Sequence, residues 1–158
     1  IVRAMPNTPA AISKGITAIV GNAKVGSRSL DEAETLLSAV GEVVRLTEEA
    51  QIDAVTGVSG SGPAYVFHMI ECMAAAGVAQ GLPEELAMQL AKATVAGAGA
   101  LAMQAEEDPA QLRVNVTSPN GTTQAALEVL MDEADGFPFL LKRAVAAAAD
   151  RSRELANG

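Results

Sequence analysis

The sequence predicts a mainly helical protein whose first residues belong to an α/β sheet. Two observations support this fold class. The composition is 49% apolar and rich in Ala, with three Phe, one Tyr and no Trp, which is typical of closely packed helices. Short β-prone runs occur only in the first 47 residues, and helical periodicity follows almost without interruption. We therefore expect the end of a sheet at 1–47 and a helical domain at 48–158.

The first 47 residues predict strands at 1–4, 16–20 and 43–47. A helix is expected between the last two strands, with Asp31 as its N-cap, Glu34 as the answering carboxylate of a capping box, and Gly41 at its end. A unit of this size cannot close a core alone, so it is interpreted as the tail of a larger sheet. Because the chain opens directly on a strand, we expect a longer polypeptide upstream.

From residue 48 onward, breaker residues divide the chain into five or six predicted helices. The run at 64–80 is apolar on nearly every face, which predicts burial on all sides and hence a packing partner. It contains His68 and Cys72 and is shorter than the ~20 residues that a bilayer requires, so it predicts a buried helix and no membrane span. We expect Cys72 to be a buried thiol and His68 to be a core or interface residue.

The charge and the cysteine count exclude several functions. A formal net charge of −8, with scattered Lys and Arg, disfavours nucleic acid and anionic membranes as partners. One Cys cannot form an intrachain disulfide, which fits a reducing cytoplasm. One His without a second His or Cys predicts that no metal is bound.

Three expected loops, rich in small and hydroxyl residues, are candidates for chemistry. Residues 5–9 follow the first strand, where an α/β sheet presents its ligand crevice, but they also suit a rigid turn. Residues 56–63 combine three Gly with two Ser before a helix, where Ser61 can act as a cap. Residues 117–123 place hydroxyls and amides at a helix start, which suits a carboxylate or phosphate but also a simple capped helix.

Taken in order, four motifs resemble pyrroline-5-carboxylate reductase: AMPNTP at 4–9, DAVTGVSGSGPAY at 53–65, GLP at 81–83 and VTSPNGTT at 116–123. The sequence RSREL at 151–155 is similar to the last helix of that family. The resemblance covers essentially the whole chain. It implies that 1–47 is the remnant of a Rossmann nucleotide-binding domain. It also implies that 48–158 is a helical substrate-binding and dimerisation domain of a 6-phosphogluconate-dehydrogenase-like kind.

The resemblance also implies a reaction, reduction of 1-pyrroline-5-carboxylate to L-proline by hydride transfer from NADPH or NADH in the cytoplasm. The implied partners are the substrate, proline and a second copy of the chain in a homodimer, with larger assemblies possible in the family. Nothing here matches the family's phosphate-binding glycine loop, so we expect the chain to be inactive alone. A non-enzymatic dimerisation module and a related dehydrogenase acting on another small acid are the alternatives.

By resemblance, individual positions receive roles. Thr56 is implied as the catalytic residue that donates or relays a hydrogen bond to the ring nitrogen. The implied substrate residues are Glu106 at the pocket edge and, in the turn that holds the carboxylate, Ser118, Gly121, Thr122 and Thr123. The implied nicotinamide contacts are Met5, Asn7, Thr8 and Asn115. Asn120 stands where the family usually has Gly, and Val114 replaces a position that is commonly acidic.

Overall fold

The computed structural model describes residues 1–157, and these fall into two compact units. The first unit contains residues 1–64 together with the chain from Leu141 onward, and the second contains Tyr65–Leu140. The sequence-based domain boundary after residue 47 separates a nucleotide-binding domain from a helical domain, and it stays a prediction.

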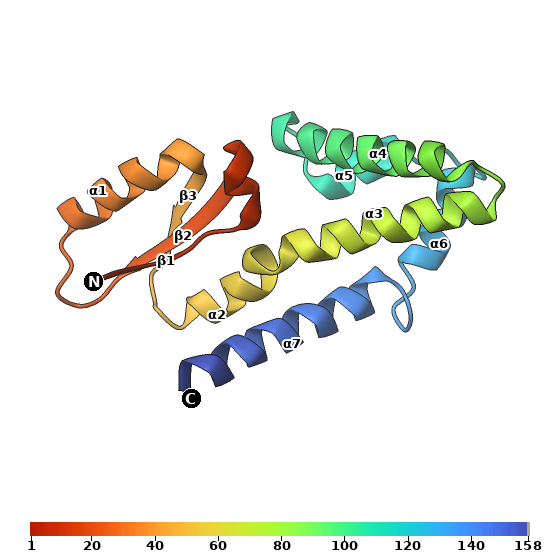
Figure 1. The fold of residues 1–158 in the computed structure, drawn as a ribbon. Helices are drawn as coiled ribbons and strands as arrows, with labels where there is room; N and C mark the ends of the chain where they lie inside the picture. Colours follow the sequence, from red (N-terminus) through yellow and green to blue (C-terminus); the bar gives the residue numbers. More distant parts are fainter. Residues whose placement is uncertain (158) are drawn as a thin grey trace. The chain divides into compact units, whose positions relative to one another are not determined.

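A three-stranded sheet forms the centre of the first unit (Figure 1). The strands β1 (Val2–Met5), β2 (Gly15–Gly21) and β3 (Gly41–Arg45) lie in the order β1-β2-β3. The pair β1–β2 is antiparallel and the pair β2–β3 is parallel. The three strands predicted from the sequence are confirmed, with ends shifted by at most two residues.

The core of the first unit lies on the middle strand. Thr17, Ala18, Ile19 and Val20 are consecutive and all buried, and Ile19 is 0% exposed. A strand that is buried without alternation is covered on both faces, as is typical where helices and neighbouring strands enclose it. The fold therefore holds β2 rigidly and supports the loops at its ends.

The helix α1 (Ser27–Leu37) crosses from β2 to β3 and begins earlier than predicted. Gly26 is its N-cap, so the prediction that Asp31 caps this helix is wrong. Asp31 instead accepts a hydrogen bond from Nη2 of Arg45 at 2.6 Å, and Glu34 accepts one from Nε at 2.7 Å. These contacts with Asp31 and Glu34 raise the pKa of Arg45. The two acidic residues thus join α1 to β3.

In the first unit, the end of α7 (Phe137–Asn157) packs on α2 (Gln51–Val55) and on the π-helical turn Thr56–Gly60. A Cβ atom on Gly57 would lie 2.7 Å from the carbonyl oxygen of Val145, so the approach requires glycine. Ser152 Oγ donates to Asp53 Oδ1 at 2.6 Å. The segment 56–63 is therefore helical, and its interpretation as a loop is wrong.

The second unit is built around a helical hairpin. It pairs α3 (Gly62–Ala79) with α4 (Glu84–Gln104), and a turn at Gly81, with φ 96°, joins the two helices. Small residues make the contact, since Ala74, Ala87 and Ala91 are buried with Ile70 and Met88 packed against them. Two short helices follow, α5 (Pro109–Asn115) and α6 (Thr122–Leu130).

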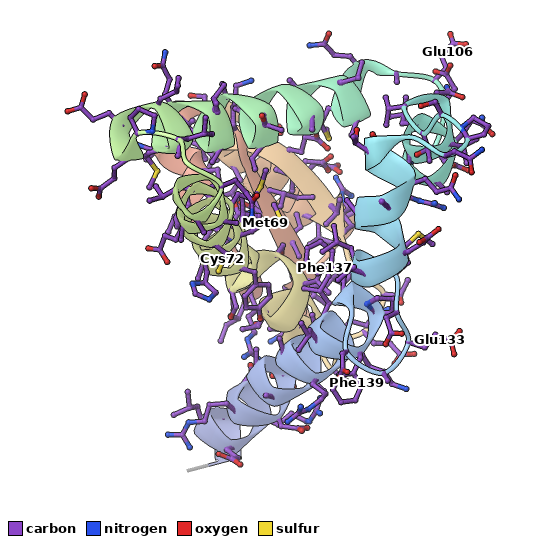
Figure 2. The ribbon with its side chains drawn as sticks, turned by 90° about the vertical axis from the view of Figure 1, so that its right-hand side faces the viewer. Met69, Cys72, Glu106, Glu133, Phe137 and Phe139 are labelled. Atoms are coloured by element: carbon purple, nitrogen blue, oxygen red, sulfur yellow. The ribbon has the colours of Figure 1, made fainter. Side chains whose placement is uncertain are left out.

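The helix α3 carries two residues that differ from expectation. Cys72 is exposed at the outer side of α3, so its prediction as a buried thiol is wrong for this chain (Figure 2). His68 is also exposed, and its Nδ1 lies 3.0 Å from Glu71 Oε2, so a core position is wrong, whereas a position in an interface stays a prediction. The expected burial of α3 on all sides is absent within the described residues, where Ala74 is its one buried residue.

Most of the large apolar side chains in the second unit reach solvent. Those on α4 include Leu86, Leu90, Leu101 and Met103, and those after it include Val114, Val116, Val129, Leu130, Met131, Phe137 and Phe139. Within the described residues, α4 is the one helix long and apolar enough to cross a membrane, judged by length and composition, and 11% of its most apolar window is buried. The second unit therefore exposes an apolar surface that requires a cover.

Candidate functional site

The first group of candidate residues surrounds the π-helical turn Thr56–Gly60. The widened turn is closed by the amide of Ser61, which donates to the carbonyl of Thr56 at 2.8 Å. Single π-turns inside helices occur often at functional sites, because the extra residue reorients the neighbouring side chains. Here it follows directly on α2, which contains the buried Ile52, 1% exposed.

The Thr56 hydroxyl is half-buried and already engaged. Its Oγ1 donates to the carbonyl oxygen of Ile52 at 2.8 Å. A hydroxyl carries one proton and two acceptor lone pairs, so in this conformation Thr56 presents an acceptor to any ligand. It could donate to a ligand only after the hydroxyl turns away from Ile52.

Met5 lies beside the same turn. A Cβ atom built on Gly60 would lie 3.5 Å from Met5 Sδ and 3.6 Å from Thr56 Cγ2. The missing side chain of Gly60 therefore leaves Met5 and Thr56 on either side of one small gap. The structure brings together a residue assigned by resemblance to the nicotinamide and the residue assigned to the ring nitrogen.

The other two residues of the first segment play different parts. Asn7 Oδ1 accepts a hydrogen bond from the amide of Ile16 at 3.0 Å, so Asn7 fastens the loop to the start of β2. Thr8 is exposed and begins the 3-10 turn Thr8–Ile12. Asn7 fixes the path of the chain, and Thr8 is left facing solvent.

The second group of candidates forms one turn before α6. The carbonyl of Ser118 accepts from the amide of Gly121 at 3.1 Å. The Ser118 hydroxyl lies where the side chain of a residue at 121 would be, so any larger residue there would displace that hydroxyl. Thr122 and Thr123 are the first two residues of α6. Ser118, Gly121, Thr122 and Thr123 are thus gathered at one helix N-terminus, where the helix dipole favours an anion.

Asn120 gives this turn its shape. Its φ of 58° is left-handed, a conformation that Asn adopts more readily than other residues with a side chain. Its amide donates to Gln124 Oε1 at 2.8 Å. The resemblance did not point to Gln124, although a Gln at the third position of a helix is the usual partner of a capping box and could have indicated it.

Glu106 and Asn115 lie outside these two groups. Glu106 projects into solvent at the corner between α4 and α5 (Figure 2). Asn115 ends α5, and its Oδ1 accepts from Gln111 Nε2 at 2.8 Å. The structure gives neither residue a hydrogen bond to the turn 117–123 within the described residues.

The charge of the second group is set by the backbone. The hydrogen bonds found for the turn 117–123 join backbone amides and carbonyls, the Thr117 hydroxyl and Gln124. An anion bound there would meet hydroxyls, amides and the positive end of α6. Such a site suits one carboxylate better than a phosphate, which carries more charge.

Comparison with known proteins agrees with this architecture. The profile of the pyrroline-5-carboxylate reductase dimerisation family matches residues 49–155. Pyrroline-5-carboxylate reductase from Pseudomonas aeruginosa is 49% identical over 157 residues, covering 99% of this chain and 57% of the relative. The protein of that name from Synechocystis is 52% identical over 155 residues, covering 98% and 57%. This chain thus spans about 57% of the length of these relatives.

Two solved structures share the fold. That of a pyrroline-5-carboxylate reductase from Coxiella burnetii has a TM-score of 0.92 at 41% identity, covering 98% of this chain and 57% of the other. That of the Plasmodium falciparum enzyme, with NADP bound, has a TM-score of 0.86 at 32% identity, covering 98% and 62%.

These findings define a helical dimerisation domain preceded by the last strands of a Rossmann sheet, which confirms the predicted fold class. The chain belongs to the pyrroline-5-carboxylate reductase dimerisation family.

Proposed function

We propose that this chain is the substrate-carboxylate-binding and dimer-forming part of a pyrroline-5-carboxylate reductase. The reaction is the reduction of 1-pyrroline-5-carboxylate to L-proline by hydride transfer from NADPH or NADH, in the cytoplasm. The observation that carries the proposal is the turn in which the Ser118 hydroxyl takes the place of a side chain at Gly121, at the start of α6. The relatives that span the chain bear the name of this enzyme.

The carboxylate of the substrate binds in this turn. The Ser118 hydroxyl and the first amides of α6 donate to it, and the Thr122 and Thr123 hydroxyls lie at the same helix start. Glu106 borders the pocket from the corner after α4. The carboxylate keeps its charge throughout the reaction, so these neutral donors bind and orient the substrate without taking part in the hydride transfer.

Thr56 then acts on the ring nitrogen as an acceptor. The Thr56 hydroxyl donates its hydrogen bond to the Ile52 carbonyl oxygen. Its own oxygen is therefore free to accept a hydrogen bond from the N–H of the protonated imine. Protonation makes the imine carbon more electrophilic, and as the hydride adds there, the electron pair of the C=N bond moves to the nitrogen. Thr56 holds that nitrogen in place without supplying the proton.

The residues of the first segment suit the nicotinamide end of the cofactor. A thioether, an amide and a hydroxyl, from Met5, Asn7 and Thr8, match the apolar face and the carboxamide of that ring, and Asn115 lies at the end of α5. When bound, the dinucleotide supplies the hydride. Its pyrophosphate requires residues beyond the matched 57% of the relatives, so the chain is inactive in isolation.

The partner in the assembly is a second copy of this chain. The apolar surface of α4 and of the elements after it is the natural interface, because the family profile for dimerisation covers these residues. Closing that surface in a homodimer removes the one candidate membrane helix from solvent. We expect neither a membrane nor nucleic acid as partner.

The test is a chimaera that joins the unmatched part of the Pseudomonas aeruginosa relative to Ile1 of this chain. We expect NADPH oxidation that depends on 1-pyrroline-5-carboxylate. Ser118→Ala should raise the KM roughly 10- to 100-fold, because one hydrogen bond to a charged group is lost. Ser29→Ala, on α1 of the first unit, is the matched control and should leave KM and kcat unchanged.

Thr56→Val should lower kcat in the chimaera, and Thr56→Ser should retain it. A Thr56→Val variant that kept turnover and only weakened binding would remove Thr56 from the reaction. A folded, dimeric chimaera that binds NADPH but reduces no 1-pyrroline-5-carboxylate would overturn the proposed function, and a test of other small imino and keto acids would then follow.

A further inference from the structure

We propose that Gln124 is a positioning residue for substrate binding. It holds the carboxylate turn in its binding conformation and occupies one backbone amide that would otherwise face the anion. This inference rests on the proposed function of the turn 117–123. It assigns a role to a side chain outside the motif on which the resemblance was based.

The first observation is the hydrogen bond from the amide of Asn120 to Gln124 Oε1, at 2.8 Å. Asn120 is left-handed, with a φ of 58°, where a residue with a Cβ atom is disfavoured relative to glycine. The Gln124 side chain reaches back over the turn and fixes that strained residue. It therefore stabilises a conformation that the local sequence alone disfavours.

The second observation is that the Gln124 amide group cannot easily flip. Its Nε2 donates to Glu128 Oε1 at 3.2 Å, one turn farther along α6. Because Glu128 accepts only, the NH2 end must face it and the oxygen must face Asn120. Gln124 is half-buried, so packing further restricts its rotamers.

The third observation is which amides remain for a ligand. The amide of Asn120 binds Gln124, and the amide of Gly121 binds the Ser118 carbonyl at 3.1 Å. The amides of Thr122 and Thr123 have no hydrogen-bond partner within the described residues. Gln124 thus directs the anion to the first amides of α6 and to the Ser118 hydroxyl, which lies over Gly121.

This arrangement predicts how substitutions at 124 behave. Leu removes the acceptor and frees Asn120 to leave the left-handed region. Glu keeps an acceptor but places a negative charge beside Glu128 and close to the incoming carboxylate. Gly at position 120 adopts the left-handed conformation without help, so it should make the turn independent of Gln124.

The experiment uses the chimaera defined above and compares Gln124→Leu, Gln124→Glu, Asn120→Gly and the double variant Asn120→Gly with Gln124→Leu. The readouts are KM and kcat for 1-pyrroline-5-carboxylate, the Kd for L-proline, and the melting temperature. Gln124→Leu should raise KM and Kd about 3- to 10-fold and leave kcat within about twofold. In the Asn120→Gly variant, Gln124→Leu should change KM and Kd by less than about twofold.

Gln124→Glu should raise KM more than Gln124→Leu does, and added salt should reduce that excess. A Gln124→Leu variant that melts at a lower temperature but binds L-proline normally would show a structural cap only and would overturn the inference. The inference would also be overturned if Gln124→Leu raised KM and Kd equally in the original chain and in the Asn120→Gly variant. Ser118→Ala separates the two hypotheses: if it has no effect on KM, the carboxylate site and the role of Gln124 fail together.

Discussion

The two units of this chain solve the problem of a core in opposite ways. In the first unit, four consecutive residues of β2 are buried, and Ile52 is 1% exposed. In the second unit the buried core residues are three alanines, Ala74, Ala87 and Ala91, while Leu and Met side chains reach solvent. The first unit therefore buries its own apolar residues, and the second needs a partner surface to do so.

This difference in burial separates the candidate residues of the first unit from those of the second. A rigid sheet and the close contact at Gly57 can hold Met5 and Thr56 without help from another chain. The proposed carboxylate turn, by contrast, lies in a unit whose apolar surface a second copy would cover in the proposed homodimer. Binding of substrate and formation of the dimer should therefore be linked, since whatever orders one favours the other.

The largest effect is expected from Gly41→Ala in the first unit. Gly41 has a φ of 146°, and a Cβ atom there would overlap the carbonyl of Gly15 on the paired strand β2. We expect a loss of about 3–5 kcal/mol in unfolding free energy, from backbone strain and a broken β2–β3 pair. Chemical denaturation measures it. Gly26→Ala is the control, because that position is open, and as an N-cap change it should cost at most about 1 kcal/mol.

Leu90→Glu tests whether the apolar surface of the second unit is a dimer interface. Leu90 is 47% exposed on α4, so a charge there is tolerated in one chain but not in an apolar interface. We expect at least a tenfold rise in the dimer dissociation constant by analytical ultracentrifugation, with the sheet intact by circular dichroism. Leu36→Glu on α1 is the matched control, and an equal effect of both substitutions would place the interface elsewhere.

Gly57→Ala should have a smaller effect, within the first unit. The new Cβ atom would lie 2.7 Å from the Val145 carbonyl and 3.2 Å from its Cγ1. We expect about 1–3 kcal/mol of destabilisation, because α7 must shift away from the π-turn. Gly62→Ala meets no atom within 4 Å and should be neutral or slightly stabilising. Similar melting curves for the two variants would contradict the close packing of α7.

The smallest effect concerns Asp132, in the turn after α6. Hydrogen bonds from the amides of Asp135 and Ala134 lower its pKa below 3.8. The carboxylate therefore stabilises the fold at pH values above its unfolded pKa, and this contribution disappears as the pH falls through the lower folded pKa. Asp132→Asn should melt at a slightly lower temperature at pH 6, and its difference from the original chain should shrink as the pH falls through the folded pKa.

The fold was largely predictable because its signals are local. Strand ends came within two residues, and the breakers after residue 80 marked the ends of α3 to α6. The errors arose where tertiary contacts decide: Asp31 pairs with Arg45 instead of capping α1, and the glycines at 57–60 serve close packing and a π-turn instead of a loop. Cys72 was expected to be buried because α3 is apolar, but burial depends on the chain that covers it.

The candidate site was only partly predictable. Hydroxyl residues before a predicted helix indicated the turn at 117–123. The structure places Ser118, Gly121, Thr122 and Thr123 together in that turn. The proximity of Met5 to Thr56 depends on the path of the backbone around Gly60, which no local pattern encodes. The direction of the Thr56 hydroxyl, toward Ile52, is also a matter of three-dimensional geometry.

A second copy of the chain is expected to cover the apolar surface of the second unit, and the other expectations depend most on this. Sedimentation equilibrium of the 158-residue chain tests it directly, because one chain has a mass of 16.1 kDa. We predict twice that mass at micromolar concentration, shifting to a single chain in Leu90→Glu. A mass of 16.1 kDa at all concentrations up to about 100 μM, where a specific dimer should be populated, would contradict the account.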